Sequence, residues 1–260
     1  MFKKIKKGIK VLKEEGLRIF LFKTANFVKV TIRPLYIKFF VFRNKEKVMH
    51  KLRNFSSDDN QKVFDYIFFK YLGVFAPMQI REEFLELLKI FKEIEPKIMV
   101  EIGTANGGTF FCFSKLAPDD ATIISIDLPE GKFSGGYPEW KIPIFKSFTV
   151  ASQKMFLLRQ DSHAQETINK VKDILNKRSV DFLFIDGDHS YEGVKKDFEM
   201  YSPLVKSSGI IAFHDIISGS EENIGGVPAF WREIESKYQT VEFIKDLNQG
   251  GCGIGLIVNH

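Results

Sequence analysis

The stretch IMVEIGTANGGT, residues 98–109, joins a short apolar segment to a turn rich in glycine. Four of the first five residues are apolar, and Gly103, Gly107 and Gly108 follow within the next six positions. Glycine lets the backbone turn sharply and approach a ligand closely. A strand that runs through such a turn into a helix opens a βαβ unit, so this stretch predicts an α/β fold.

Short apolar segments alternate with helical ones through the rest of the chain. We expect strands at 98–102, 122–127, 155–159, 180–186 and 209–214, with helices near 107–117, 163–176 and 192–205. Two last strands, 240–245 and 253–258, flank the Gly250-Gly251 turn and are expected to pair antiparallel. The pattern predicts a Rossmann-like, seven-stranded, mostly parallel sheet with helices on both faces and an antiparallel last strand.

Three regions are predicted along the 260 residues: a basic amphipathic segment 1–53, a helical lead-in 54–96 and a main domain 97–260. The first region holds 16 Lys and Arg against three acidic residues, although the whole chain carries only +5. Ile5, Ile9 and Leu12 fall near helical spacing among these lysines. We therefore expect a helical N-terminal segment that binds an anionic membrane surface. The alternative is a solvated helix that packs on its own domain.

Other features bound the class of protein. Only two cysteines occur, Cys112 and Cys252, which does not suggest a disulfide framework and fits a reducing cytoplasm. The expected location is cytoplasmic, with attachment to the inner face of the membrane, since no apolar run reaches spanning length and no signal peptide is recognisable. A nucleic-acid partner is not expected, because the basic segment is rich in Phe, Ile and Leu. A homo-oligomer is possible.

Each predicted parallel strand ends in polar side chains. These are Glu101, Asp127, Asp161, Asp186 and the pair His214-Asp215. Ligands of open α/β sheets bind beyond the carboxyl ends of the strands, so these residues predict one site. Asp127, about 20 residues past the glycines, suits the ribose hydroxyls of an adenosine cofactor, and Asp161-Ser162 suits the adenine. The alternative for Asp161 is an N-cap of the following helix.

The glycine turn, Asp127, Asp161, FIDGDHSYEG (184–193) and GIIAFHDI (209–216) together resemble a class I S-adenosylmethionine (SAM)-dependent methyltransferase. The chain is more closely similar to the macrocin O-methyltransferase and cephalosporin hydroxylase-like family over residues 78–258. The resemblance implies SAM as the cofactor. The implied cofactor-binding residues are Glu101, Gly103, Thr104, Gly107, Asp127, Asp161, Ser162 and Asp186.

The same resemblance implies catalytic and metal-binding residues. Asp186, His214 and Asp215 would hold a divalent metal, and His189, with Asp186, would act as the catalytic base. Oxygen ligands suit Mg²⁺, but the imidazole of His214 stands where the family usually has a carboxylate or Asn, and it suits Mn²⁺ better. The alternatives are a strand-end His214 bonded to backbone, and a His189 that caps the next helix or orients Asp186.

The leading hypothesis is a metal-assisted O-methyltransferase that acts on a hydroxyl of a sugar, glycoside or related small molecule. Loop 129–148 is expected to cover the cofactor, and loop 216–227 to line the acceptor pocket. One alternative is an NAD-dependent oxidoreductase, which the G-x-x-x-G-G spacing disfavours. A second is a non-catalytic, membrane-peripheral scaffold on the same fold.

Overall fold

The computed structural model describes residues 36–129, 135–150, 152–219 and 224–259. The predicted amphipathic helix before residue 36 lies outside them. Residues 36–48 belong to one compact unit and hold a π-helical turn, Ile37–Val41, and the start of α4, Lys45–Arg53. The chain from Met49 onward forms a second compact unit that contains the whole sheet. No helix among the described residues is both long and apolar enough to cross a membrane.

Seven strands form one sheet in the order β3-β2-β1-β4-β5-β7-β6. The strands are β1 Ile98–Ile102, β2 Thr122–Asp127, β3 Lys154–Arg159, β4 Val180–Ile185, β5 Val205–His214, β6 Thr240–Phe243 and β7 Ile254–Val258. All the pairings among β1 to β5 are parallel, and β7 is antiparallel to both β5 and β6. The predicted fold class is confirmed. The strand order reverses at β1 and β4, which is where such sheets bind ligands.

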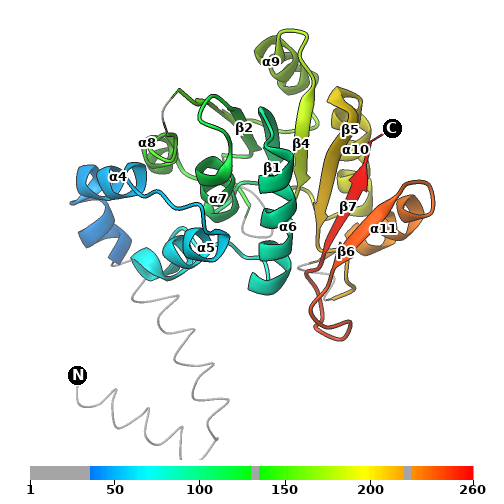
Figure 1. The fold of residues 1–260 in the computed structure, drawn as a ribbon, viewed down its shortest axis with the longest axis horizontal. Coiled ribbons are helices and arrows are strands. Elements are labelled where there is room, and N and C mark those ends of the chain that lie inside the picture. The colour runs from blue at the N-terminus through cyan, green and yellow to red at the C-terminus, as the bar shows by residue number, and fades with distance from the viewer. Residues whose placement is uncertain (1–35, 130–134, 151, 220–223, 260) are drawn as a thin grey trace, which may run out of the picture. The chain divides into compact units, whose positions relative to one another are not determined.

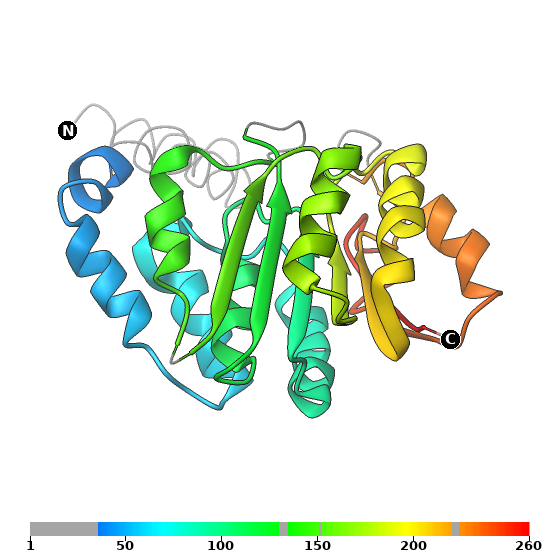
Figure 2. The same cartoon turned by 90° about the horizontal axis from the view of Figure 1, so that it is seen from above.

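Helices cover both faces of the sheet (Figures 1 and 2). On one face lie α5 Asn60–Phe69, α6 Arg81–Ile94, α7 Gly108–Leu116 and α8 Ile142–Lys146, and on the other α9 Gln165–Leu175, α10 Tyr191–Tyr201 and α11 Val227–Glu235. Each crossover from β1 to β5 returns the chain to the start of the next parallel strand. The carboxyl ends of these strands therefore share one edge.

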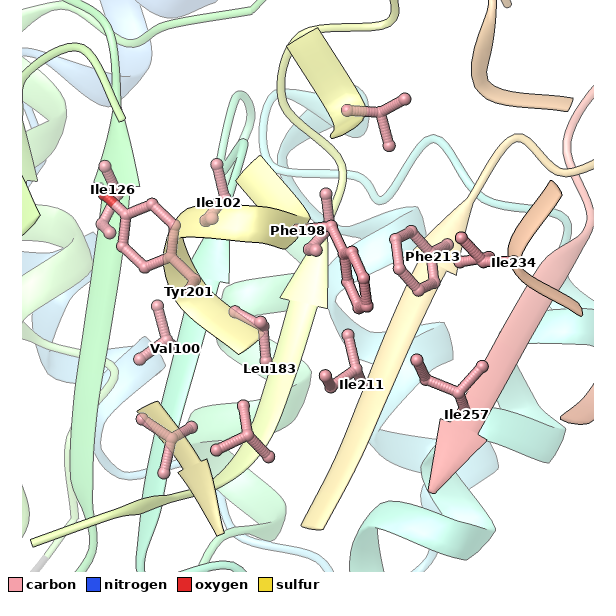
Figure 3. Packing of buried hydrophobic residues seen from close by; sticks show 14 of the residues in the cluster. Val100, Ile102, Ile126, Leu183, Phe198, Tyr201, Ile211, Phe213, Ile234 and Ile257 are labelled. Atoms are coloured by element: carbon pink, nitrogen blue, oxygen red, sulfur yellow. The ribbon is translucent and has the colours of Figure 1, made fainter. Parts of the chain in front are cut away.

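Two aromatic layers hold the helices on the sheet. On the α6 and α7 side, Phe113 lies 5.3 Å from Phe182 and 5.6 Å from Phe184 between ring centroids. On the other side, Phe198 and Tyr201 of α10 pack over strand residues such as Leu183 and Phe213 (Figure 3). Burial of such large apolar side chains is the main stabilising contribution to a fold of this kind.

One boundary differs from its prediction for a local reason. The helix expected at 192–205 ends at Tyr201, because Pro203 cannot continue it, and residues Ser202–Leu204 form a 3₁₀ turn. Strand β5 then begins at Val205 rather than at 209, with a register shift against β4 between Val180 and Phe182. The second half of β5 still delivers His214 to the carboxyl edge.

Candidate active site

A cavity of about 640 Å³ opens at the carboxyl edge of the sheet, close to the strand-order reversal. Loops after β1, β2, β3 and β4 all contribute to its wall. The predicted cofactor residues that line it are Gly103, Asp127, Asp161, Ser162 and Asp186. This volume lies within the usual range for a small-molecule or cofactor site.

The glycine turn after β1 forms the floor of this cavity. Gly103 has φ of 91°, and a Cβ added there would lie 1.8 Å from the carbonyl oxygen of Asp186. Gly107, with φ of 84°, meets the ring of Phe145 at 2.4 Å in the same way. Only glycine fits these left-handed and crowded positions. Gly107 therefore packs against Phe145 and does not line the cavity.

Glu101 and Thr104 lie beneath the turn. Glu101 is fully buried, and its Oε2 accepts a 2.8 Å hydrogen bond from the hydroxyl of Thr104, which also lies 2.7 Å from the Ser125 hydroxyl. Burial raises the pKa of Glu101 to about 8. Glu101 is therefore a neutral acid at pH 7 that supports the turn, while Thr104 borders a small side pocket next to Asp186.

Asp127 links the glycine turn to the loop that follows β2. Its Oδ2 accepts from the N–H of Ala105 at 2.6 Å, and its Oδ1 accepts from the N–H groups of Leu128 and Gly136. Burial raises the pKa of Asp127, and these backbone donors oppose the rise. Since Oδ1 already accepts two bonds, Oδ2 is the oxygen with room for a further donor, such as one ribose hydroxyl.

Asp161 and Ser162 form a tight turn after β3. Helix α9 begins at Gln165 with Ala164 as its N-cap residue, so the alternative interpretation of Asp161 as the cap of this helix is wrong. Asp161 Oδ1 instead accepts from the N–H of His163 at 2.8 Å. Its side chain is 60% exposed and is free to meet a ligand at the cavity wall.

Two aspartates and two histidines gather where β4 and β5 end. The Nδ1 atom of His214 lies 3.1 Å from Asp186 Oδ1 and 3.4 Å from Asp215 Oδ1. His189 lies between the same two carboxylates, with Nε2 at 3.7 Å from Asp186 and Nδ1 at 3.5 Å from Asp215. The predicted catalytic and metal-binding residues therefore form one cluster in which acids and imidazoles alternate.

The cluster decides between the alternatives for its histidines. Helix α10 is capped by Ser190, whose hydroxyl accepts from the N–H of Gly193, so the interpretation of His189 as the cap is wrong. The Nδ1 atom of His214 faces carboxylates, which does not support the idea of a strand-end histidine bonded to backbone. Asp215 has φ of 64°, a strained conformation for a residue other than glycine that is frequent at functional sites.

The two charge types in the cluster shift each other's pKa values. Burial lowers the pKa of His214, but the carboxylates of Asp186 and Asp215 outweigh this and raise it well above its ordinary value. Burial also raises the pKa of Asp186, but His214 and His189 outweigh this effect and lower that pKa to about 2. Asp186 is therefore ionised throughout the physiological range.

The donor set of the cluster fits a divalent cation. Ligand atoms of Asp186, His189 and Asp215 lie within 4.8 Å of one another, and a second such group is His214, Asp215 and Cys252. The Nε2 atom of His214 is buried and has no hydrogen-bond partner among the described residues. An imidazole among carboxylates suits Mn²⁺ better than Mg²⁺. Both His189 and His214 lie close to the two predicted aspartate ligands, so His189 joins His214 as a candidate nitrogen ligand.

Gln79 is a site residue that the sequence analysis missed. It is 6% exposed in the loop before α6, and its Nε2 donates to Asp186 Oδ2 at 2.7 Å. Its Oε1 accepts from the N–H of Met78, which fixes the orientation of the amide. Met78 itself lines the cavity. A lone glutamine in a loop has no periodicity or charge that would single it out.

Glu83 of α6 is a second residue that the sequence did not single out. It supports the site through the loop between β6 and β7. It is 2% exposed, and its carboxylate accepts from the N–H groups of Lys245 and Gly253 and from the side chain of Gln249. These bonds order the loop between β6 and β7. The N–H of Cys252 in that loop donates to Asp215 Oδ1 at 3.1 Å, so α6 helps to position the cluster of two aspartates and two histidines.

The chain matches the family model described as "Methyltransferase domain" over residues 100–216. It is 29% identical to "Uncharacterized protein y4gI" of Sinorhizobium fredii over 153 residues, 58% of this chain but only 16% of that protein. It is 24% identical to "Probable caffeoyl-CoA O-methyltransferase 3" of Dictyostelium discoideum over 60% of this chain and 62% of that one.

A solved structure has the same fold. The "O-methyltransferase from Bacillus cereus" in complex with S-adenosylhomocysteine (SAH) matches with a TM-score of 0.51 and 13% identity, over 80% of this chain and 93% of that chain. This likeness shows the fold alone, and the match to the methyltransferase domain is what favours the methyltransferase prediction over the NAD-dependent alternative.

Replacement of Gln79 by Leu removes the amide donor to Asp186 at nearly constant size. Because a hydrogen bond to a charged group contributes about 1.5–3 kcal/mol, we expect the free energy of unfolding in urea to fall by that amount. Met78→Leu, a change at a 50% exposed neighbour, serves as the control and should change it by less than about 0.5 kcal/mol. Equal stability of the two variants would contradict the assigned contact.

Glu101 gives the protein a specific dependence of stability on pH. Its pKa is raised from 4.5 to about 8, so the folded state binds a proton that the unfolded state releases in this window. Stability is therefore highest below pH 4.5 for this group and falls towards pH 8, at about 1.4 kcal/mol per pH unit at most. The variant Glu101→Gln should lack this decline in a series of thermal midpoints. If the thermal midpoints of the two proteins depended on pH in the same way, the raised pKa of Glu101 would be refuted.

Proposed function

Because residues 100–216 are a class I methyltransferase domain, we propose that the protein transfers a methyl group from SAM to a hydroxyl oxygen of a small acceptor, most simply a sugar or glycoside. The observation that carries the proposal is the position of the Asp186, His189 and Asp215 cluster beside the cavity that Gly103, Asp127 and Asp161 line. A cofactor in that cavity and an acceptor over the cluster would meet at the carboxyl edge of β4.

His189 is the general base in this proposal. Its imidazole is 13% exposed at the cavity wall and is held between two carboxylates at 3.7 Å and 3.5 Å. The acceptor oxygen attacks the methyl carbon, the carbon–sulfur bond breaks, and the electron pair remains on sulfur as SAM becomes S-adenosylhomocysteine (SAH). His189 takes the hydroxyl proton, and Asp186 and Asp215 stabilise the imidazolium that forms.

A divalent metal, when bound, would lower the pKa of the acceptor hydroxyl. Asp186 and Asp215 with one imidazole would hold it, and both His189 and His214 are close enough to serve. If His189 is the ligand, it cannot also be the base, and proton removal would then fall to the remaining cluster. Metal dependence of His189 variants separates these two arrangements.

The acceptor class rests on the resemblance to macrocin O-methyltransferase-like proteins and on the polar groups of the cluster. A phenolic acceptor is the competing class, because the Dictyostelium relative is named a caffeoyl-CoA O-methyltransferase. Transfer of radiolabelled methyl from SAM to free and nucleotide-linked sugars, or to catechols, discriminates the two directly.

His189→Ala should lower kcat by about 10²–10⁴-fold, because the base is lost, while SAH binding remains within a few-fold of the unchanged protein. Glu192→Gln, three residues further on, is the matched control and should leave kcat nearly unchanged, since Glu192 is exposed on α10 and does not line the cavity. Unchanged turnover in His189→Ala would rule out the assignment of the base.

We further propose that residues 1–53 bind an anionic membrane surface, which would suit an acceptor carried on a lipid. The support is the composition of this segment, which holds 16 basic and three acidic residues. Flotation with vesicles of phosphatidylglycerol should recover the full chain at low salt, and recovery should fall with rising salt. Vesicles of phosphatidylcholine alone are the control, and equal recovery with both would sink the proposal.

A further inference from the structure

His163 borders the cofactor cavity just beyond β3, and a buried carboxylate holds its imidazole. The Nε2 atom of His163 lies 3.1 Å from the carbonyl oxygen of Gly193 and 3.1 Å from Asp197 Oδ1. Asp197 is fully buried on α10, and neither of its oxygens accepts a hydrogen bond within the described ranges. Since an isolated buried carboxylate is costly, the ion pair with His163 is what offsets its charge.

These contacts fix which nitrogen of His163 carries a proton. A backbone carbonyl and a carboxylate can only accept, so Nε2 must be the donor. The other nitrogen, Nδ1, lies 3.9 Å from Asp161 Oδ1, which is too long for a hydrogen bond. Nδ1 is therefore the nitrogen that is available to a ligand in the cavity. It is a donor when the ring is charged and an acceptor when it is neutral.

The charges around the ring favour its charged form. The close carboxylate of Asp197 raises the pKa of His163, and Asp161 adds to the rise, whereas burial and Lys196 on α10 oppose it. The ring is only 17% exposed, so these neighbours act with little screening by water. In its charged form the ring carries an N–H at Nδ1, the nitrogen that no acceptor within the described residues occupies.

We infer that His163 is a cofactor-binding residue whose protonated Nδ1 donates a hydrogen bond to the adenosyl part of SAM and SAH. The inference rests on the proposed cofactor. Its position agrees with this role, because Asp161 and Ser162, the residues expected to meet the adenine, directly precede it.

The contact between His163 and Asp197 also links the cavity to the loop that carries Asp186 and His189. Asp197 lies under Gly187, where an added Cβ would be 3.1 Å from Asp197 Oδ2. Gly187 stands between Asp186 and the turn that carries His189. A cofactor bound to His163 would therefore hold Asp197, and with it the loop after β4, in one position.

The test is titration calorimetry of the full-length protein with SAH from pH 6 to pH 9. Affinity of the unchanged protein should fall as His163 loses its proton. In His163→Ala, affinity at pH 6 should be about tenfold weaker, the loss expected for one charge-assisted hydrogen bond, and the decline with pH should be smaller. Asp197→Asn should move the midpoint of the decline to lower pH, because the group that raises the pKa of His163 is gone.

Tyr201→Phe is the matched control. It removes a second hydrogen bond between α10 and this loop, from the Tyr201 hydroxyl to the backbone carbonyl of Ser162 at 2.8 Å, and Tyr201 itself does not line the cavity. Its pH midpoint should equal that of the unchanged protein. If His163→Ala keeps the full decline with pH, or if Tyr201→Phe loses it equally, the inference is overturned. If the unchanged protein fails to bind SAH at any pH, the proposed function falls first and this inference with it.

Discussion

The structure depends on one close backbone contact, between the glycine turn after β1 and the end of β4. The N–H of Asp186 donates to the carbonyl of Ile102 at 2.8 Å, and Gly103 packs on the carbonyl of Asp186 with no room for a Cβ. This contact joins the floor of the cavity directly to Asp186, which begins the loop that carries His189. In the proposed reaction it would hold a cofactor on the turn and an acceptor over the cluster at a fixed separation, which is what a direct methyl transfer requires.

A sheet edge that collects so many acids has to balance their charges. Glu101 does so by remaining protonated, Asp127 by accepting three backbone N–H groups, and Asp197 by its ion pair with His163. Asp186 and Asp215 are left for His189 and His214. The number and kind of its partners, and not its place in the sequence, therefore determine whether an acid supports the fold or remains available in the cluster.

Most of the fold was predictable, because its signals are local. Apolar strands followed by glycine or by acids give the alternation of strand and helix, and the parallel order then gathers Asp127, Asp186 and Asp215 at one edge. Glu101 is fully buried beneath the turn, and its contact with the cofactor stays a prediction. The residues that were missed have partners distant in the chain. Gln79 and Glu83 act on the site across more than 100 residues of sequence, and no local pattern reports such contacts.

We expect SAM to bind at this edge with its methyl carbon facing the cluster of Asp186, His189 and Asp215. A crystal structure of the protein with SAH and Mn²⁺ tests this arrangement. The adenosyl group should lie between Asp127 and the Asp161 turn, with the sulfur directed towards His189. Density for SAH outside this cavity, or a sulfur that points away from the cluster, would contradict it.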